Sequence, residues 1–208
     1  MIRTPADPLR LKSERHRYNF AVAGKFSDAE LSLLSSSFEQ FFEVVGTGLG
    51  EVLVSRDLSF RLDSRGGNYF KSPFVVNLNT IRLTEWTIVH ELGHALDASH
   101  GWTLSRRMAK ATGSYFPSKF MHKSFPKWRL FWYHVGSPPP PCGRNAKFNA
   151  LEDFAETVAA YIFPERSKAK AATKGFNYEN YGYQHFHETP RGRFFESLLT
   201  EFKTQTPS

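Results

Sequence analysis

The sequence has almost no cysteine: Cys142 is the single one in 208 residues. A disulfide framework and a zinc module built from several cysteines are therefore both excluded. No apolar run reaches the roughly 18 residues of a membrane span, so no transmembrane helix is expected. The segment from Met1 to Arg17 is polar and basic, and it lacks the apolar core of a secretory signal peptide. These absences predict a chain that is cytoplasmic or exported by a non-classical route.

Basic residues outnumber acidic residues, and the chain has a formal net charge of +7 and a pI of about 9.5. The lysines and arginines are scattered, which favours a solvated basic surface over a nucleic-acid site, although an acidic partner fits the same balance. Hydrophobic residues make up 40% of the chain and include 20 Phe, enough for a core. The length predicts one domain over residues 20–208, preceded by a flexible basic arm at residues 1–19.

The most informative motif is H-E-x-x-H, formed by His90-Glu91-Leu92-Gly93-His94. Apolar residues recur at helical spacing around it and predict a helix. Histidines four residues apart lie on one face of a helix, so both imidazoles can bind one zinc ion. Glu91 lies beside that face, where its carboxylate can take a proton from a zinc-bound water. The competing interpretation is a helix that carries two histidines by chance.

A catalytic zinc site needs a third protein ligand, and the sequence offers two candidates. Glu152 and Glu156 lie one turn apart on a helix predicted from Leu151 to Phe163. Glu152 can then bind the metal while Glu156 accepts a hydrogen bond from a ligand histidine; as a plainer alternative, both favour the helix macrodipole. The other candidate is His100, which completes H-E-x-x-H-x-x-G-x-x-H except that Asp97 replaces the glycine.

Further helices and strands are expected on both sides of these motifs. Ser27 and Glu30 form a capping box that opens a helix, which Gly46, Gly48 and Gly50 are expected to end. Residues 74–79 suit a sheet edge where an extended substrate can pair. Residues 165–183 are predicted to form a loop. Strands are predicted at residues 51–62, 69–70 and 74–78, and a final helix is predicted at residues 190–202. The expected fold class is α+β: a small mixed sheet, an H-E-x-x-H helix and a second ligand-bearing helix.

These motifs resemble the zincin metallopeptidases, and the stretch Glu152-Asp-Phe-Ala-Glu156 is similar to the gluzincin branch. The nearest resemblance is to the catalytic domain of anthrax lethal factor and related toxin-like metallopeptidases. It implies a zincin-like fold, a protein or peptide substrate, and a Zn²⁺ cofactor held by His90, His94 and Glu152. It also implies Glu91 as general base and acid. The side chains of Glu156 and Asp97 are expected to contact the ligand residues and not the metal itself.

The sequence therefore predicts a zinc-dependent endopeptidase. The scissile carbonyl needs a donor for the negative charge that develops on its oxygen. Tyr181, Tyr183 and His185 are candidates, and an aromatic loop without a catalytic role is the competing interpretation. The alternative function is a binding protein for nucleic acid or an acidic protein, with zinc structural or absent, because lysines alternate with aromatic residues from Lys119 to Trp132. The enzyme is favoured because a structural zinc site is usually closed by four side chains, often cysteines.

Overall fold

A computed structural model describes residues 9–15, 18–54, 58–62, 69–71, 74–79, 83–120, 129–136, 149–173 and 183–205, and the fold is α+β. The strands are β1 (Leu9–Ser13), β2 (Tyr18–Ala23), β3 (Ser59–Leu62), β4 (Tyr69–Lys71), β5 (Val75–Leu78), β6 (Gly113–Phe120) and β7 (Arg129–Gly136). The helices are α1 (Asp28–Val54), α2 (Glu85–Ser99), α3 (Thr103–Thr112), α4 (Ala150–Ile162), α5 (Pro164–Thr173) and α6 (Pro190–Gln205), with the 3-10 helix η3 (Tyr183–Glu188). None of the described helices combines the length and apolarity needed to cross a bilayer.

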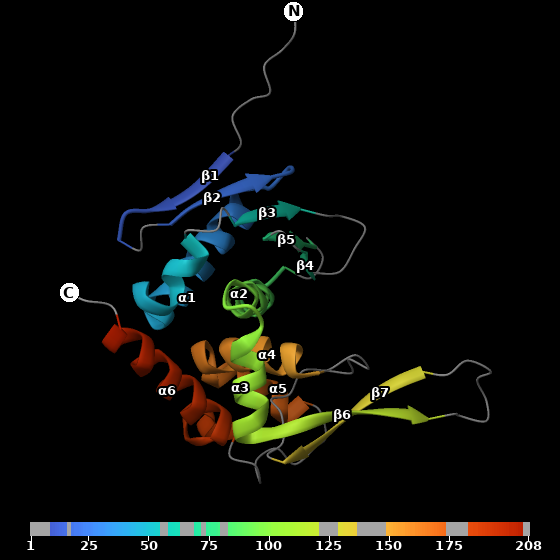
Figure 1. Cartoon of the computed structure of the whole chain (residues 1–208). Helices are drawn as coiled ribbons and strands as arrows, with labels where there is room; N and C mark the ends of the chain where they lie inside the picture. The colour runs from blue at the N-terminus through green and yellow to red at the C-terminus, as the bar shows by residue number, and fades with distance from the viewer. Residues whose placement is uncertain are drawn as a thin grey trace, which may run out of the picture.

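The larger sheet is mixed and has the strand order β1-β2-β3-β5-β4 (Figure 1). Strands β2, β3 and β5 are parallel, and β1 and β4 pair antiparallel at the two edges. Strand β1 corrects the prediction of a flexible arm over residues 1–19, because Leu11 pairs with Phe20 in β2. The two apolar residues of β1 are too short a pattern to indicate a strand by themselves. Residues 1–8, 16 and 17 of that segment lie outside the described residues.

Two other predictions about this region are wrong. Strand β5 is not an edge strand, because β4 pairs along its outer side and leaves the free edge to β4. Residues 51–54 do not begin a strand, since α1 bends at Gly46 and continues to Val54. Gly46 has φ 70°, a conformation that glycine adopts without strain. The helix resumes after the bend because Leu49 and Leu53 are buried.

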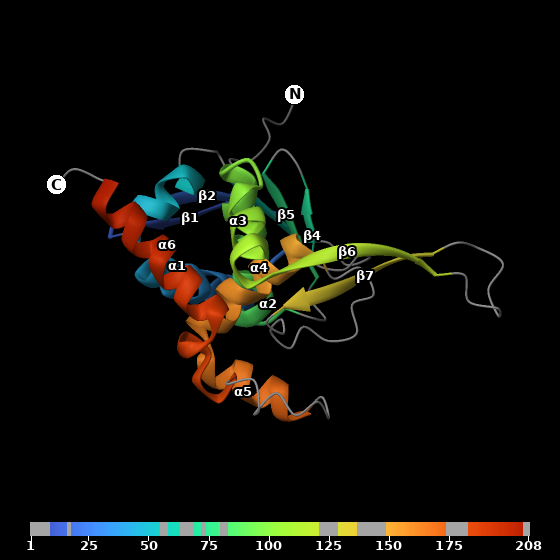
Figure 2. The ribbon, with the colours of Figure 1, turned by 60° about the horizontal axis from the view of Figure 1, so that its bottom comes forward.

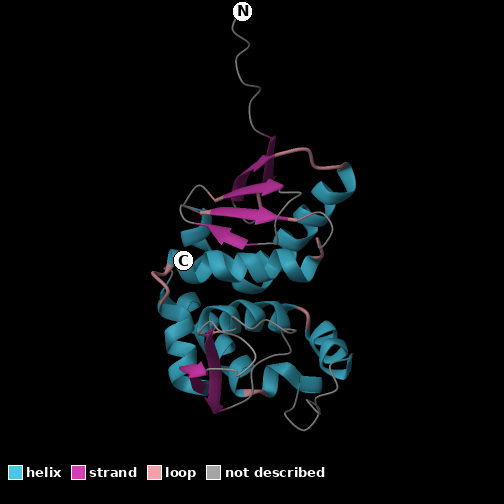
Figure 3. Ribbon diagram, turned by 90° about the vertical axis from the view of Figure 1, so that its right-hand side faces the viewer, coloured by secondary structure: helices cyan, strands magenta, loops and turns pink. Residues whose placement is uncertain are grey.

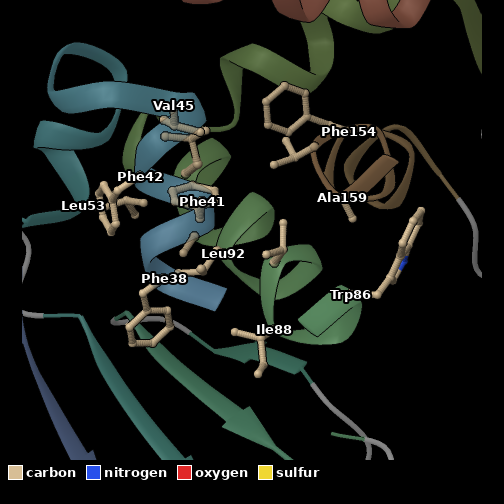
Figure 4. Packing of buried hydrophobic residues seen from close by; sticks show 14 of the residues in the cluster. Phe38, Phe41, Phe42, Val45, Leu53, Trp86, Ile88, Leu92, Phe154 and Ala159 are labelled. Atoms are coloured by element: carbon tan, nitrogen blue, oxygen red, sulfur yellow. The ribbon is translucent and has the colours of Figure 1, made fainter. Parts of the chain in front are cut away.

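One hydrophobic cluster extends from Tyr18 to Leu199 and surrounds α2. Figure 4 shows Phe41 of α1 on one side of Leu92, and Phe154 of α4 on the other side of α2. These three side chains are fully buried. Because α2 is covered from both sides, close packing fixes its rotation and the direction of its polar residues.

The sheet with α1 and α2 forms one half of the molecule, and α4, α5, α6 and the β6–β7 ribbon form the other (Figure 3). Helix α5 replaces the loop predicted for residues 165–183, of which residues 174–182 lie outside the described part. Pro164 ends α4 as expected but also opens α5, where its missing N–H costs no hydrogen bond. The lysines and alanines that follow are good helix formers.

Candidate metal centre

Helix α2 carries both histidines of the motif on its side facing α4. A capping box fixes where the helix begins: Thr84 N donates to Thr87 Oγ1 at 2.9 Å, and Thr87 N donates to Thr84 Oγ1 at 3.1 Å. His90 and His94 then stand one turn apart, with ring centroids 4.8 Å apart. Their side chains are 16% and 10% exposed, so they line a site that solvent still reaches.

Helix α4 brings Glu152 to the two histidines. The Asn149 side chain caps this helix by accepting from the backbone N–H groups of Leu151 and Glu152, at 2.9 and 3.3 Å. Glu152 Oε2 lies 3.4 Å from Nε2 of His90, and Glu152 Oε1 lies 3.7 Å from Nε2 of His94. One ligand atom from each of these three residues lies within 4.8 Å of the others. The structure therefore brings Glu152, and not His100, to the histidine pair.

Gly93 is the residue that lets the two helices come this close. A Cβ at this position would lie 2.9 Å from Ala155 Cα and 3.3 Å from Val158 Cβ, both in α4. The Ala155 contact is to backbone, which a side-chain rotation cannot relieve. Glycine between the two histidines thus sets the spacing between α2 and α4. This spacing in turn sets the distance from Glu152 to the histidines.

The three side chains fit a zinc ion. Two imidazole nitrogens and one carboxylate oxygen are a ligand set of catalytic zinc, which leaves a fourth position for water or substrate. Ligand atoms about 2.0–2.2 Å from a tetrahedral centre lie roughly 3.3–3.6 Å from one another. The 3.4 Å from Nε2 of His90 to Oε2 of Glu152 falls in that range, and Nε2 of His94 lies 3.7 Å from the other oxygen, Oε1.

Glu156 lies behind His90 and is held by three donors. Its Oε2 lies 2.9 Å from Nδ1 of His90 and accepts from Nε1 of Trp86 at 2.8 Å. Its Oε1 accepts from Nζ of Lys170 at 2.6 Å, and this ammonium also lies 3.9 Å from the centre of the Trp86 ring. This carboxylate favours a proton on Nδ1 of His90, so Nε2, which faces Glu152, is the nitrogen that would bind a metal.

Negative charge around His90 favours a cation at this point. Burial alone lowers the pKa of His90, but Glu152 and Glu156 outweigh it and raise the pKa. Burial alone raises the pKa of Glu152, yet hydrogen bonds to His90 and His94 lower it overall. The pKa of Glu156 is lowered to about 2, because His90 and Lys170 outweigh its burial. The carboxylates are therefore ionised, as metal ligands must be.

Glu91 is the buried carboxylate between the two histidines in the sequence. It is 4% exposed, and burial raises its pKa. Its Oε2 is buried without a hydrogen-bond partner among the residues the structure describes. A buried acceptor without a protein donor is costly, which is typical of a group whose partner is a ligand or reacting water.

A buried ion pair holds α4 in place below the site. Arg191 of α6 donates through Nε to Oδ1 of Asp153 and through Nη2 to Oδ2, both at 2.7 Å. The two side chains are 1% and 0% exposed. Asp153 directly follows Glu152, so this bidentate contact fixes the first turn of α4 from the side opposite the histidines.

The remaining predicted residues lie elsewhere. His100 ends α2, where its ring packs on Phe202 at 5.1 Å, away from the other two histidines. Asp97 does not bond either motif histidine in the described part of the chain. Its Oδ1 instead accepts from the N–H groups of Leu104 and Ser105, at 3.0 and 3.1 Å, and so caps α3.

The described candidates for stabilising the oxyanion, Tyr183 and His185, both lie on the short helix η3. Tyr183 is 1% exposed and packs on Phe186 at 5.7 Å, in a helix that contacts α4, α5 and α6. His185 is exposed on the same short helix. Tyr181 lies outside the described residues, so its role stays a prediction.

Sequence reasoning missed Lys170 and the polar role of Trp86. Trp86 is one turn before His90, which signals that the two share a face, but an indole in an apolar helical pattern is typical of a core residue. Lys170 carries no such signal, because its helix was expected to be a loop.

Comparisons with protein-family models, with curated proteins and with solved structures give no match. Function is therefore inferred from the site itself.

Proposed function

We propose that this chain is a zinc-dependent metalloendopeptidase of the zincin type, in the gluzincin branch. The observation that carries the proposal is the grouping of His90, His94 and Glu152 within 4.8 Å, with Glu91 buried beside them. A mixed sheet next to the H-E-x-x-H helix, and a second helix that supplies a glutamate, support a zincin-like arrangement.

Each residue has a distinct task in this proposal. His90, His94 and Glu152 would hold zinc, which supplies Lewis acidity when bound. Glu91 takes a proton from the attacking water and later returns it to the leaving amine. Glu156 keeps Nε2 of His90 available by accepting a hydrogen bond from Nδ1–H. Strand β4, which ends the large sheet among the described strands, would position an extended peptide by strand addition.

Zinc content tests the ligand set. Elemental analysis of wild type and Glu152→Ala, side by side, should give about one zinc per chain in the wild type and a large loss in the variant. His100→Ala is the matched control and should keep the metal. A folded wild type that binds no zinc after reloading would overturn the proposal, and zinc retained by Glu152→Ala would move the third ligand elsewhere.

Glu91→Gln separates metal binding from catalysis. The variant should keep its fold and its zinc, because Gln has the same shape and Glu91 is not a ligand. It should lose cleavage of a pooled library of quenched fluorescent peptides by about 10²-fold or more. Cleavage at the wild-type rate would remove Glu91 from the role of general base.

A further inference from the structure

Strand β1 ends the large sheet on the side opposite to β4. It comes first in the order β1-β2-β3-β5-β4, and among the described strands it pairs only with β2. Its outer edge therefore presents backbone N–H and C=O groups to which a further extended chain can add. Figures 1 and 2 show β1 and β4 at opposite ends of the sheet. Helix α2 contacts β4 and β5, so the β1 edge lies outside the metal centre.

One side of β1 is apolar and continues the core. Leu9 pairs with Val22 and Leu11 with Phe20, and both partners in β2 are buried. Paired residues of antiparallel strands lie on the same face of a sheet, and Phe20 contacts Phe38 of α1, so the two leucines belong to the face that packs on α1. Leu9 is nevertheless 51% exposed, and it is the one large hydrophobic side chain exposed among the described residues. An apolar side chain on an added strand would cover it.

The other side of β1 is basic. Arg10 and Lys12 alternate with the leucines, and both are exposed. They lie opposite Ala21 and Asn19 of β2, which carry no charge. Arg10 donates to the backbone oxygen and to Oδ1 of Asn19, at 3.3 and 3.4 Å, and neither cation pairs with a carboxylate in the described part of the chain. A strand added here would therefore meet two positive charges that no anion neutralises.

The same two cations disfavour a second copy of this chain as the occupant. Two β1 strands can pair antiparallel with their apolar sides on one face. In the registers available, Arg10 then lies opposite Arg10 or Lys12 of the other copy, or Lys12 lies opposite Lys12. Like charges directly opposite each other destabilise a sheet, and a basic edge commonly prevents self-association. A strand of opposite charge would gain from the same two positions.

We propose that the β1 edge binds an extended segment of a partner protein in which apolar and acidic residues alternate. The apolar residues cover Leu9 and lengthen the core beyond Leu11, and the acidic residues pair with Arg10 and Lys12. Strand addition requires backbone N–H and C=O groups, so the occupant is a polypeptide and not a nucleic acid. The chain then has an interaction surface separate from the site proposed for catalysis.

Peptide binding to the full-length Glu91→Gln chain tests the proposal without cleavage. Fluorescence anisotropy would compare a short labelled peptide of alternating Val and Glu, the same peptide with Gln in place of Glu, and a single-stranded DNA. The Glu peptide should bind about tenfold or more tightly than the Gln peptide, and its affinity should fall as salt rises.

Two N-methylated forms of the Glu peptide test whether it adds as a strand. Successive backbone N–H groups of a strand point to opposite edges, so methylation of every second nitrogen removes the N–H groups of one edge only. One form loses the groups that bond β1, and the other keeps them. The two forms carry the same charge, yet their affinities should differ.

Charge reversal locates the surface. Arg10→Glu with Lys12→Glu should weaken binding of the Glu peptide by about tenfold and should strengthen binding of a peptide of alternating Val and Lys. Lys110→Glu with Lys203→Glu, at exposed sites on α3 and α6, makes the same change in net charge and should do neither. Circular dichroism checks the fold of both variants, and the gain of binding to the Lys peptide requires an intact edge.

Equal affinity for the Glu and Gln peptides, or for the two methylated forms, would overturn the inference. Tighter binding of the DNA than of the Glu peptide would overturn it too, as would an equal effect of the two charge reversals, because net charge alone would then explain the binding. A wild-type dimer that dissociates in the β1 variant would assign the edge to a second copy instead. These readouts need neither zinc nor cleavage, so the inference and the proposed function can fail separately.

Discussion

At the scale of single residues, the metal centre depends on side chains that do not themselves donate to a metal. Gly93 sets how near α4 comes, and Glu156 sets which nitrogen of His90 faces Glu152. Lys170 and Trp86 hold Glu156 in turn. The site is thus a set of ligands with a polar support built from α2, α4 and α5.

Gly93→Ala should destabilise the chain, although glycine to alanine within a helix normally stabilises by about 0.5–1 kcal/mol. The new Cβ meets the backbone of Ala155 at 2.9 Å and forces α2 and α4 apart. We expect the free energy of unfolding to fall by about 1–3 kcal/mol, measured by chemical denaturation. Zinc affinity should fall with it. A variant that is more stable than wild type would show that the close packing of α2 on α4 does not depend on this glycine.

Lys170→Met should weaken zinc binding by about 10–100-fold, measured by competition with a chelator. Methionine keeps the packing on Trp86 but removes the ammonium that holds Glu156 Oε1. Lys168→Met is the control, since its side chain is 56% exposed on the same helix. Lys170→Arg should restore most of the affinity. If the two methionine variants bind zinc equally well, Lys170 does not support the site.

At the scale of helices and strands, two ion pairs join α6 to its neighbours and differ in burial. Arg191 and Asp153 are almost fully buried, whereas Arg107 and Glu201 are 45% and 36% exposed. Arg191→Met should lower the free energy of unfolding by about 3–5 kcal/mol, because it leaves a charge buried without its partner. Arg107→Met should cost less than about 1 kcal/mol. If chemical denaturation shows that both variants lose the same free energy of unfolding, the buried ion pair does not hold α4 in place.

The contact between β2 and α1 should make the stability of the fold depend on pH under alkaline conditions. Tyr18 is 2% exposed and donates to Oε1 of Glu39 at 2.7 Å. Burial first, and then Glu39, raise the pKa of its phenol. The folded state therefore favours the protonated phenol, and its contribution is complete below the unfolded pKa of about 10 and lost as pH rises above it. Denaturation at several pH values should show a smaller alkaline loss of stability in Tyr18→Phe than in wild type. Equal slopes would exclude Tyr18 as the cause.

Sequence patterns predicted those elements whose signals are local. The helical periodicity around His90 and Phe154 gave α2 and α4, and the spacing of Glu152 and Glu156 placed both glutamates on the side of α4 near the histidines. Elements defined by tertiary contacts were not predictable: β1 is a strand because it pairs with β2. The cap that Asp97 provides for α3 likewise joins residues on two different helices.

At the scale of the whole molecule, zinc should strengthen the contact between the half that holds the sheet and α2 and the half that holds α4, which already pack together (Figure 3). Two ligands come from α2, beside the sheet, and the third comes from α4 in the other half. A metal that binds only the folded chain stabilises it by about 2.7 kcal/mol at 100 times its dissociation constant. Thermal melting with and without zinc should show a higher Tm for the wild type and no shift for Glu152→Ala. Addition of a chelator should reverse the shift.

The order of the ligands along the chain has a consequence for biosynthesis. A ribosome produces the histidine helix first, then α3 and the β6–β7 ribbon, then Glu152, and only afterwards Arg191, which secures α4. Until α6 has emerged from the exit tunnel, the nascent chain holds the two histidines without a fixed carboxylate. The donor set is therefore complete only after α6 has been made, and a chain truncated before α6 carries the motif but not the fixed site.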